Sequence, residues 1–417
     1  MKKLFLFPAA VFFTVHAGAQ TSTLFENNYP DKKNSIGIEA SYFINSNAVT
    51  TEFTNAYLNS KFLDADIKDG SLKKMKDKNT LGSELNGGIY YRYGSKKSTD
   101  TCRVSHFFSL KERTHFTTKF PKDLFELYFY GNKPFAGTSA DISNFNYRSL
   151  QYQQLQFGMM HETRKGDKEF GYAVAVSLLN GENFIEIKTT TGSLFTDADA
   201  EYVDMQLHLE SKQSDSTHKS FGSSNGLGAS ADLELHYGVK NKYNIRFSAN
   251  DIGMISWNKK SFLFEVDTTY HFEGVVVNNL FDSLYLDLKS EQDFKEGFKE
   301  NKQSKSVKTT LPFRFNLSYE RTLTPEKLTM ALGAEYILNS DFIPLISLTT
   351  NYFISSRFHA GIILQYGGYG GFHGGVHLDK DFGKGFILTA GTAYLDGYVM
   401  SSSSAGQGGY AGIKKIF

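Results

Sequence analysis

Apolar and polar residues alternate one by one over long stretches of this chain. In LGASADLELHYG (227–238), leucine, alanine and tyrosine occupy every second position, and glycine, serine, aspartate, glutamate and histidine lie between them. An alternation of eight or more residues predicts a β-strand whose two faces differ in polarity. The same pattern recurs in SIGIEASY (35–42), VDMQLHLE (203–210), YNIRFSAN (243–250), SFLFEVDTTYHFEGVV (261–276) and FRFNLSYE (313–320).

The links between these runs come in two lengths. Tight links such as KGDK (165–168), TPEK (324–327) and DFGKG (381–385) alternate with long polar ones such as SKQSDSTHKSFGSSNG (211–226) and SSSSAGQGG (401–409). Outer-membrane β-barrels show this asymmetry, because their periplasmic turns are short and their extracellular loops are long.

Alternation by itself is compatible with a soluble β-sandwich as well as with a membrane barrel. Three features favour the barrel. Several runs reach the roughly 9–11 residues of a tilted transmembrane strand. Charged residues such as Asp232, Glu234 and Arg314 stand in mid-strand, as a water-filled lumen permits. The chain ends in Phe417, a typical last residue and assembly signal of such barrels, although Lys415 stands where an apolar residue is usual.

The predicted fold is all-β, a single transmembrane up-and-down antiparallel β-barrel of about 14 strands, within a range of 12–16, formed by residues 20–417. About seventeen runs show the strand pattern, but a barrel with both chain ends in the periplasm needs an even number. We expect the surplus to lie in 184–210 or 339–356. Helical spacing predicts short insertions between strands near 53–78, 121–131 and 280–302.

The first nineteen residues (1–19) have the features of a secretory signal peptide. Lys2 and Lys3 precede the apolar stretch LFLFPAAVFFTV (4–15), and small residues lead to a predicted cleavage site after Ala19. Export by this route leads us to expect the protein in the outer membrane. The balance of 45 basic and 44 acidic residues does not favour a nucleic-acid partner.

The segment QYGGYGGFHGGVHL (365–378) is rich in glycine and aromatic residues. Its glycines do not fit a phosphate-binding loop, which also needs a following helix. His373 and His377 would lie about 13 Å apart on a strand, too far for one metal ion. We therefore predict two strands joined by a tight turn, whose residues are candidate contacts to the lumen or to a plug: Gly368, Tyr369, Gly370 and Gly371.

PKDLFELYFYGN (121–132) predicts a short helix, with proline at its start and glycine at its end. Leu124, Phe125 and Tyr128 form its apolar face and are further candidate plug contacts. Two alternatives remain open. The helix folds into the lumen as a plug, or it lies over the barrel mouth or at the lipid boundary.

Other groupings of reactive residues are weaker. The acidic stretch TDADAE (196–201) lacks the glycine and the distal glutamate of a calcium-binding EF-hand loop and is interpreted as a solvated loop. Cys102, the single cysteine, stands in a polar link and is not expected to be reactive. We predict no catalytic, metal-binding or cofactor-binding residues, and we do not expect an enzyme.

Four segments carry a resemblance to known proteins: FPKDLFELYFYGN (120–132), DIGMISW (251–257), GGYGGF (367–372) and the KKIF ending. From about residue 30 to the C-terminus the chain resembles a family of Bacteroidota outer-membrane barrels of unassigned function. More distantly, it resembles the FadL-type fatty-acid channels and the PorV and PorP/SprF barrels of the type IX secretion system. The FadL resemblance favours fourteen strands. The family implies no known catalytic or binding residues.

Two functions therefore remain open. The first is a passive conduit or FadL-like transporter for small molecules, hydrophobic ones among them. The second is a non-transporting subunit of an outer-membrane assembly, such as secretion or surface-display machinery. The expected partners are outer-membrane lipid, the machinery that inserts barrels, and other outer-membrane or secretion-system proteins.

Overall fold

The computed structural model describes residues 34–95, 101–215, 222–273 and 303–417. The predicted signal peptide (1–19) and the helical insertion predicted near 280–302 lie outside the described residues.

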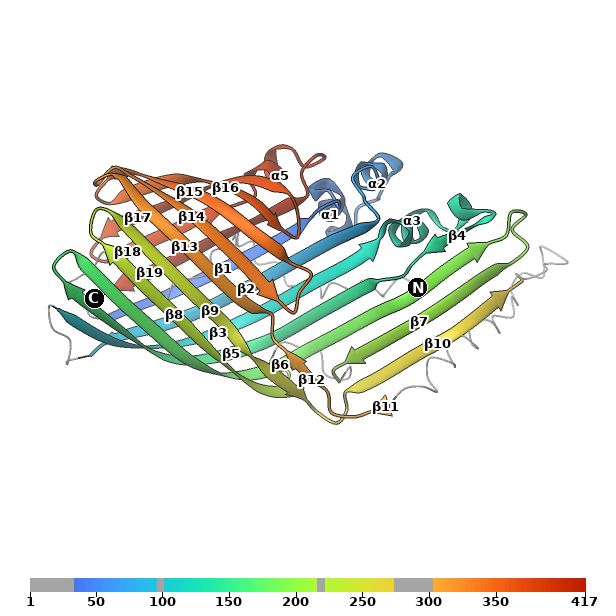
Figure 1. Cartoon of the computed structure of the whole chain (residues 1–417), viewed down its shortest axis with the longest axis horizontal. Helices are drawn as coiled ribbons and strands as arrows, with labels where there is room; N and C mark the ends of the chain where they lie inside the picture. Colours follow the sequence, from blue (N-terminus) through green and yellow to red (C-terminus); the bar gives the residue numbers. More distant parts are fainter. Residues whose placement is uncertain (1–33, 96–100, 216–221, 274–302) are drawn as a thin grey trace.

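Fourteen antiparallel strands form a closed barrel (Figure 1). Each strand pairs with its neighbours, and the first strand pairs with both the second and the last, which closes the ring. This confirms the predicted fold and strand number. In chain order the barrel strands are β1 (Asn34–Ser46), β2 (Lys78–Gly94), β3 (Cys102–Pro121), β5 (Phe145–Lys165), β6 (Lys168–Thr196), β8 (Gly226–Val239), β9 (Tyr243–Trp257), β13 (Phe313–Thr324), β14 (Leu328–Leu338), β15 (Ile343–Ser355), β16 (Phe358–Gly368), β17 (Phe372–Gly383), β18 (Phe386–Thr392) and β19 (Gly406–Ile416).

The two ends of the barrel differ. At one end, which we call the turn end, β5–β6, β8–β9, β13–β14, β15–β16 and β17–β18 are joined by tight turns. Asn34 and Phe417 lie together there, with the Asn34 N–H 3.2 Å from the Phe417 carbonyl oxygen. At the other, the loop end, most connections are long and carry helices and extra strands. Short turns at one end and long connections at the other are the asymmetry that the lengths of the links predicted.

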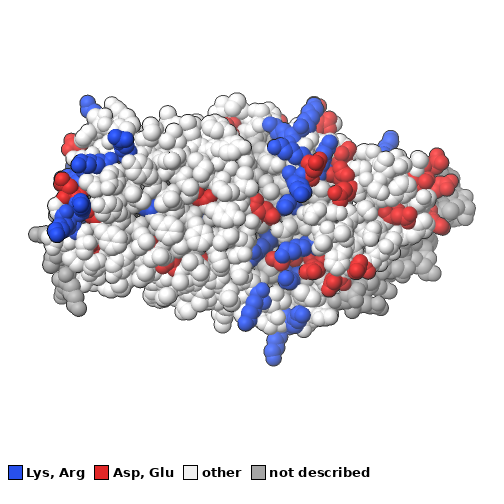
Figure 2. All heavy atoms as spheres, viewed as in Figure 1, with Lys and Arg blue, Asp and Glu red and all other residues white. Residues whose placement is uncertain are grey.

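An apolar belt surrounds the barrel on its outer face. Figure 2 shows this surface almost free of charge, between charged residues at the turn end and a band of lysine and arginine towards the loop end. Large apolar side chains such as Ile38 and Val176, each 63 % exposed, point outward all around the belt. In β8 the apolar positions face outward, as at Leu233, and the charged positions face inward, as at Asp232. The predicted face assignment is correct.

Lys415 also fits this belt. Its ammonium lies over the Phe386 ring, 4.1 Å from the ring centre, and donates to the Lys384 carbonyl oxygen in a turn. A lysine at the membrane boundary can extend its charge into water in this way while its methylene groups stay in the apolar layer.

Five strands of the described residues lie outside the barrel. β7 (Val203–Gln213) pairs with the outer part of β6, and β10 (Phe262–Phe272) pairs with β7, so that a sheet extends beyond the loop end (Figure 1). The run 203–210 and the described part of the run 261–276 therefore form strands that are not barrel strands. The alternative place for the surplus run, 339–356, is wrong, because β15 is part of the barrel. The remaining strands are β4 (Thr138–Asp141), β11 (Gln303–Ser304) and β12 (Lys308–Thr310).

Three helices form a cap at the loop end: α1 (Thr51–Leu58), α2 (Ala65–Leu72) and α3 (Lys122–Tyr130). The side chains of Thr50 and Asp64 accept backbone N–H groups and start α1 and α2. Gly131, at φ 82°, ends α3. These helices lie in the segments 53–78 and 121–131, or next to them, where the sequence predicts helical insertions. No helix among the described residues is long and apolar enough to cross a membrane.

A short helix that the sequence did not predict, α5 (Leu395–Val399), is part of the barrel wall. β18 is the shortest barrel strand, and its ladders with β17 and β19 reach only Thr392 and Gly391 at the loop end. Beyond that point α5 lies between β17 and β19. Its Asp396 carboxylate accepts the His373 Nδ1–H (2.9 Å) and the Gly374 N–H (3.2 Å) of β17.

Candidate functional site

Opposite walls of the barrel touch across the lumen through buried charges. Arg314 on β13 donates to Glu84 on β2, although β2 and β13 lie six places apart in the order of fourteen strands. Both residues are only 5 % exposed. The Arg314 guanidinium also bonds Glu335 of β14 at 2.8 Å, and Glu84 bonds the His115 imidazole of β3 at 3.1 Å. This group crosses the lumen.

A second group beside it joins β3 to β9, which lie four places apart in the order of barrel strands. Arg113 of β3 forms an ion pair with Asp251 of β9 at 2.9 Å and bonds the Gln154 side chain at 3.3 Å. Asp232 of β8 accepts the Asp251 backbone N–H at 2.7 Å and the Gln156 amide at 2.6 Å. We call the two groups together the lumen seal. The expectation that the mid-strand charges lie in a water-filled lumen is wrong here, because the side chains are buried and bonded to one another.

A bulge in β9 places Asp251 in the seal. Asp251 has φ 60°, and the β8–β9 ladder shifts register between Ala231 and Leu233. Ile245 faces outward before the bulge and Ile252 after it, so the alternation changes phase by one residue. A bulge re-aims a side chain in this way. The phase change between YNIRFSAN and DIGMISW is the signal by which the sequence could have revealed it.

The glycine-rich turn inserts an aromatic ring into the lumen beside the seal. Gly367 and Gly368, at φ 109° and 75°, make the tight turn between β16 and β17. Tyr369 is 1 % exposed, and its hydroxyl bonds Ser340 and, at 3.4 Å, the His115 Nε2. On the facing strand, a Cβ added at Gly82 would lie 2.1 Å from the Tyr369 ring, so only glycine leaves room for the ring.

The other candidate plug residues lie elsewhere. Gly370 packs against Asn45 of β1, where a Cβ would lie 2.4 Å from the Asn45 amide nitrogen, whereas Gly371 borders open space. Leu124 and Phe125 pack in the cap, with the Phe125 ring 5.4 Å from the Phe53 ring of α1. Tyr128 is 44 % exposed. The described structure thus places α3 over the mouth and not within the seal.

The interior differs on the two sides of the seal. Beside Glu84 and Arg314 the described residues leave a cavity of only about 10 Å³, the space of one water molecule. Towards the turn end, inward side chains are partly exposed, so water reaches the inner wall there: Asn316, Ser318, Glu320, Thr329 and Asn351. The interior is therefore open to water from the turn end and is closed at the lumen seal.

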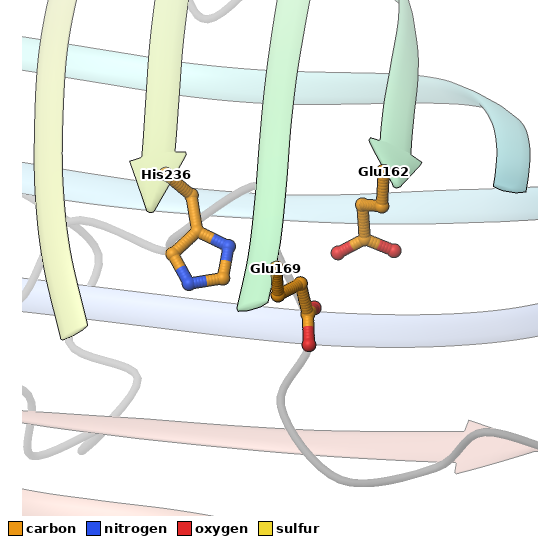
Figure 3. A group of neighbouring side chains, drawn as sticks. All are labelled: Glu162, Glu169 and His236. Carbon is orange, nitrogen blue, oxygen red and sulfur yellow. The ribbon is translucent and has the colours of Figure 1, made fainter. Parts of the chain in front are cut away.

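Three metal-ligand side chains meet at the turn end: Glu162 of β5, Glu169 of β6 and His236 of β8 (Figure 3). One ligand atom from each lies within 4.8 Å of the others. Arg164 already pairs with Glu169 at 2.7 Å, and Arg92 lies 3.9 Å from Glu162. Guanidinium groups therefore occupy the carboxylates that a cation would need, and the arrangement is that of an ion-pair cluster.

A model of a protein family matches residues 28–389 of the sequence. The chain belongs to the family of unknown function DUF5723. No curated protein matches this DUF5723 chain in sequence.

Solved structures with a similar course of the chain include two toluene transporters and a FadL homologue. The toluene transporter TbuX of Ralstonia pickettii has 8 % identity and a TM-score of 0.44, over 93 % of this chain and 90 % of that one. The toluene transporter TodX of Pseudomonas putida has 9 % identity and a TM-score of 0.41, over 93 % and 89 %. A FadL homologue of Pseudomonas aeruginosa has 8 % identity and a TM-score of 0.37, over 93 % and 89 %.

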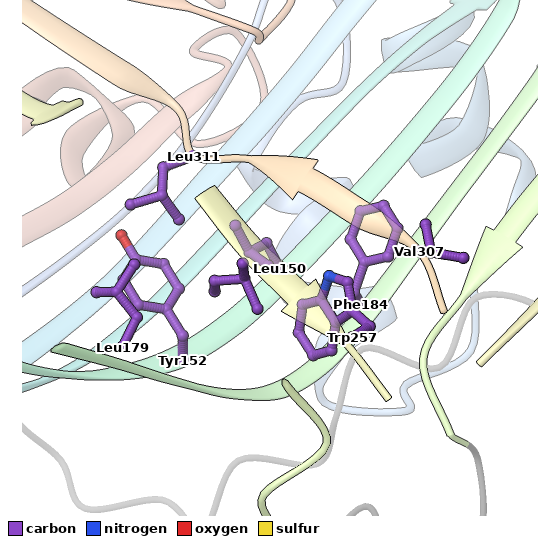
Figure 4. Packing of buried hydrophobic residues seen from close by; sticks show 8 residues of the cluster. Leu150, Tyr152, Leu179, Phe184, Trp257, Val307 and Leu311 are labelled. Carbon is purple, nitrogen blue, oxygen red and sulfur yellow. The ribbon is translucent and has the colours of Figure 1, made fainter. Parts of the chain in front are cut away.

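On the loop-end side of the seal, the lumen of this DUF5723 barrel is filled by apolar side chains. Phe184 of β6 stacks on Trp257 of β9 with ring centres 5.6 Å apart (Figure 4). The indole N–H donates to Thr309 at 2.9 Å. The segment that carries Thr309 lies across this end and adds Val307 and Leu311 to the cluster. The other members are Leu150, Tyr152, Leu179 and Ile255.

The other residues that the sequence analysis considered as ligands or reactive groups form contacts within the protein. His373 bonds Asp396, and His377 bonds Asn351, so the two imidazoles belong to separate contacts. In the acidic stretch 196–201, the Asp197 carboxylate accepts the backbone N–H groups of residues 199 and 201, at 2.9 and 3.3 Å. The Cys102 sulfur lies 3.3 Å from the His161 Nε2.

Beyond the belt, the extra sheet carries His–Asp pairs between β7 and β10, His208 with Asp267 at 3.6 Å and the closer pair of His271. His271 of β10 lies opposite Asp204 of β7, with Nδ1 and Oδ1 2.5 Å apart. The hydrogen bond to Asp204 raises the pKa of His271 above its ordinary value, and a second bond to Glu273 adds to this. In the cap, burial raises the pKa of Tyr57 to about 12.

Proposed function

We propose that this protein is a gated outer-membrane conduit for small water-soluble molecules and that the described structure is its closed state. The lumen seal carries the proposal. On one side of the seal, water enters the interior from the turn end. On the other side, Trp257 and its neighbours fill the loop end. A barrel that does not conduct has no need for a row of ion pairs that closes a hydrated interior.

The chemistry of the seal favours polar cargo. Arg113, Arg314, Glu84 and Asp251 are ionisable groups held in place by each other. Water or a polar solute can replace such partners one by one, whereas an apolar molecule would leave the charges unsolvated at a cost of several kcal/mol. The hydrophobic cargo expected from the FadL resemblance therefore finds no matching surface at this level of the lumen.

Conductance across a planar lipid bilayer tests the proposal. The wild-type barrel is expected to be closed most of the time and to show brief openings. Replacing Arg113→Ser and Arg314→Ser together leaves Glu84, Glu335 and Asp251 without their guanidinium partners. Repulsion and hydration should then separate the walls, raise the open fraction and give a preference for cations.

The control is Arg164→Ser, which removes an ion pair at the turn end and leaves the seal intact. Its trace should match the wild type. If the wild type and the double variant are both silent, while a heat-dependent change in gel mobility shows folded barrels, the barrel is not a conduit.

One observation favours a second function, that of a membrane anchor. The sheet of β6, β7 and β10 extends beyond the loop end and takes no part in the lumen. Such a surface suits a subunit of an outer-membrane assembly, including the type IX secretion system suggested by the resemblance. A silent barrel that co-purifies with the same partner from mild detergent and from cross-linked cells would support this function.

The proposal includes the location in the outer membrane, with the turn end towards the periplasm. It also includes removal of residues 1–19 during export, and assembly by the insertion machinery through the strand that ends at Phe417. N-terminal sequencing of protein from isolated outer membranes tests the cleavage site. A mature chain that still begins at Met1 contradicts it.

A further inference from the structure

Four lysines gather on one surface where the apolar belt meets the loop end. Lys259 and Lys260 follow the end of β9, Lys308 lies in β12, and Lys305 stands three residues before it. All four are exposed. Backbone bonds hold their segments together, since the Lys305 N–H donates to the Ser261 carbonyl at 2.9 Å. We call these residues the lysine patch.

The strand register places the patch at the boundary of the belt. On β9 the outward side chains Ile252 and Met254 are 45 % and 51 % exposed and belong to the belt. The next outward position is Ser256, which pairs with Lys308 on one side and with Leu227, 70 % exposed, on the other. One row across three strands therefore passes from an apolar side chain through a hydroxyl to an ammonium group.

A ligand that matches this row has acyl chains joined to an anionic head group. Its chains would lie on Leu227, Ile252 and Met254, and its anion would lie among the ammonium groups. Phosphate is the anion that fits best, because several lysines can surround one doubly charged group as point charges. Within the described residues, the Lys260 nitrogen of the patch lies 3.9 Å from the carboxylate of Asp215, which is buried.

We propose that the lysine patch binds the phosphate groups of a phosphorylated glycolipid in the outer leaflet, a lipid of the lipid A type. In the proposed orientation the loop end faces that leaflet. The apolar belt beside the patch lies against the acyl chains of the membrane lipids. The site lies on the outside of the wall, so it does not depend on whether the lumen conducts.

Binding of purified full-length protein to defined lipids tests the proposal. The probes are bisphosphorylated lipid A and the same lipid with both phosphates removed, each presented in mixed micelles. The wild type is expected to retain the phosphorylated lipid, and Lys259→Gln, Lys260→Gln, Lys305→Gln and Lys308→Gln together should weaken retention at least tenfold, since each lysine near an anionic surface contributes roughly fivefold.

The matched control neutralises four exposed lysines of the turn end: Lys165, Lys168, Lys240 and Lys242. It should bind bisphosphorylated lipid A as the wild type does. The proposal fails if the dephosphorylated lipid binds equally well, or if the patch variant binds as the wild type does. It also fails if the two variants lose binding to the same extent, which would show attraction by overall charge. Heat-dependent gel mobility confirms that each variant is folded.

Discussion

Replacing Arg314→Met tests the energetics of the lumen seal. Arg314 is 5 % exposed and is the shared partner of Glu84 and Glu335, which come from opposite walls of the barrel. Methionine keeps most of the volume but removes the charge and every donor. Glu84, itself 5 % exposed, is then left with the His115 imidazole as its partner in this group, and Glu335 loses its ion pair.

The size of the effect follows from burial. Removing one member of a buried ion pair typically costs about 3–5 kcal/mol, because the remaining charge is buried without compensation. We expect the free energy of unfolding of Arg314→Met to fall by about that amount. A triple variant that also carries Glu84→Gln and Glu335→Gln should recover most of the loss, since replacing a whole buried ionic group by neutral side chains is often nearly neutral.

The assay uses the single tryptophan of the chain. Trp257 is buried in the cluster next to the seal, so its fluorescence follows urea unfolding of the barrel in lipid vesicles. A loss below about 1 kcal/mol for Arg314→Met would show that water solvates the seal and would refute its description as dry. A triple variant less stable than the single one would show that the ion pairs stabilise the barrel by themselves.

Four further predictions follow from other features. Gly82→Leu should displace the Tyr369 ring and lower the stability of the barrel, as measured by the same urea unfolding. An unchanged midpoint would contradict the close contact in the lumen. Leu233→Arg should cost about 2–4 kcal/mol if the site lies near the bilayer midplane, and a single cysteine there, in a chain without the native one, should be reached by a lipid-phase quencher. His271→Gln should reduce the pH dependence of the extra sheet, as hydrogen exchange of β10 would show. Protonation strengthens the pair with Asp204, so the contribution of this pair is complete below the ordinary pKa of about 6.5 and is lost as the pH rises through the raised pKa. Deleting Phe417 with the residue before it should lower the amount of assembled barrel in outer membranes, and wild-type levels would mean that the end of β19 carries no assembly signal.

The sequence predicts most of the barrel because a membrane imposes one rule on every strand. Lipid on one side and polar contacts on the other require alternation, so the face assignment at Leu233 and Asp232 follows from period alone. The same pattern made the runs of β7 and β10 candidate barrel strands, because a two-faced sheet outside the membrane alternates as well. Membership of the closed ring depends on pairing partners, which local period does not encode.

The seal could not be predicted because it joins residues far apart in the chain. Glu84 and Arg314 are separated by 230 positions, and each by itself is an ordinary inward charge on an alternating strand. Burial, which decides whether such a charge is hydrated, depends on how closely opposite walls approach. Tyr369 was a candidate because its glycine neighbours signalled a tight turn, although its contact with His115 depends on the facing wall.

The short helix α5 gives the barrel a mechanical weak point. Elsewhere neighbouring strands of the ring are joined by ladders of backbone hydrogen bonds, which resist being pulled apart along their length. Between the loop ends of β17 and β19 the connection consists of a few contacts to one helical turn, such as those of Asp396 with His373 and Gly374. A stretch applied around the rim, whether by lateral pressure in the membrane or by a neighbouring protein, therefore concentrates its strain there. The part of the rim next to α5 should therefore deform most easily. Its backbone amides should be the first of the wall to exchange with solvent.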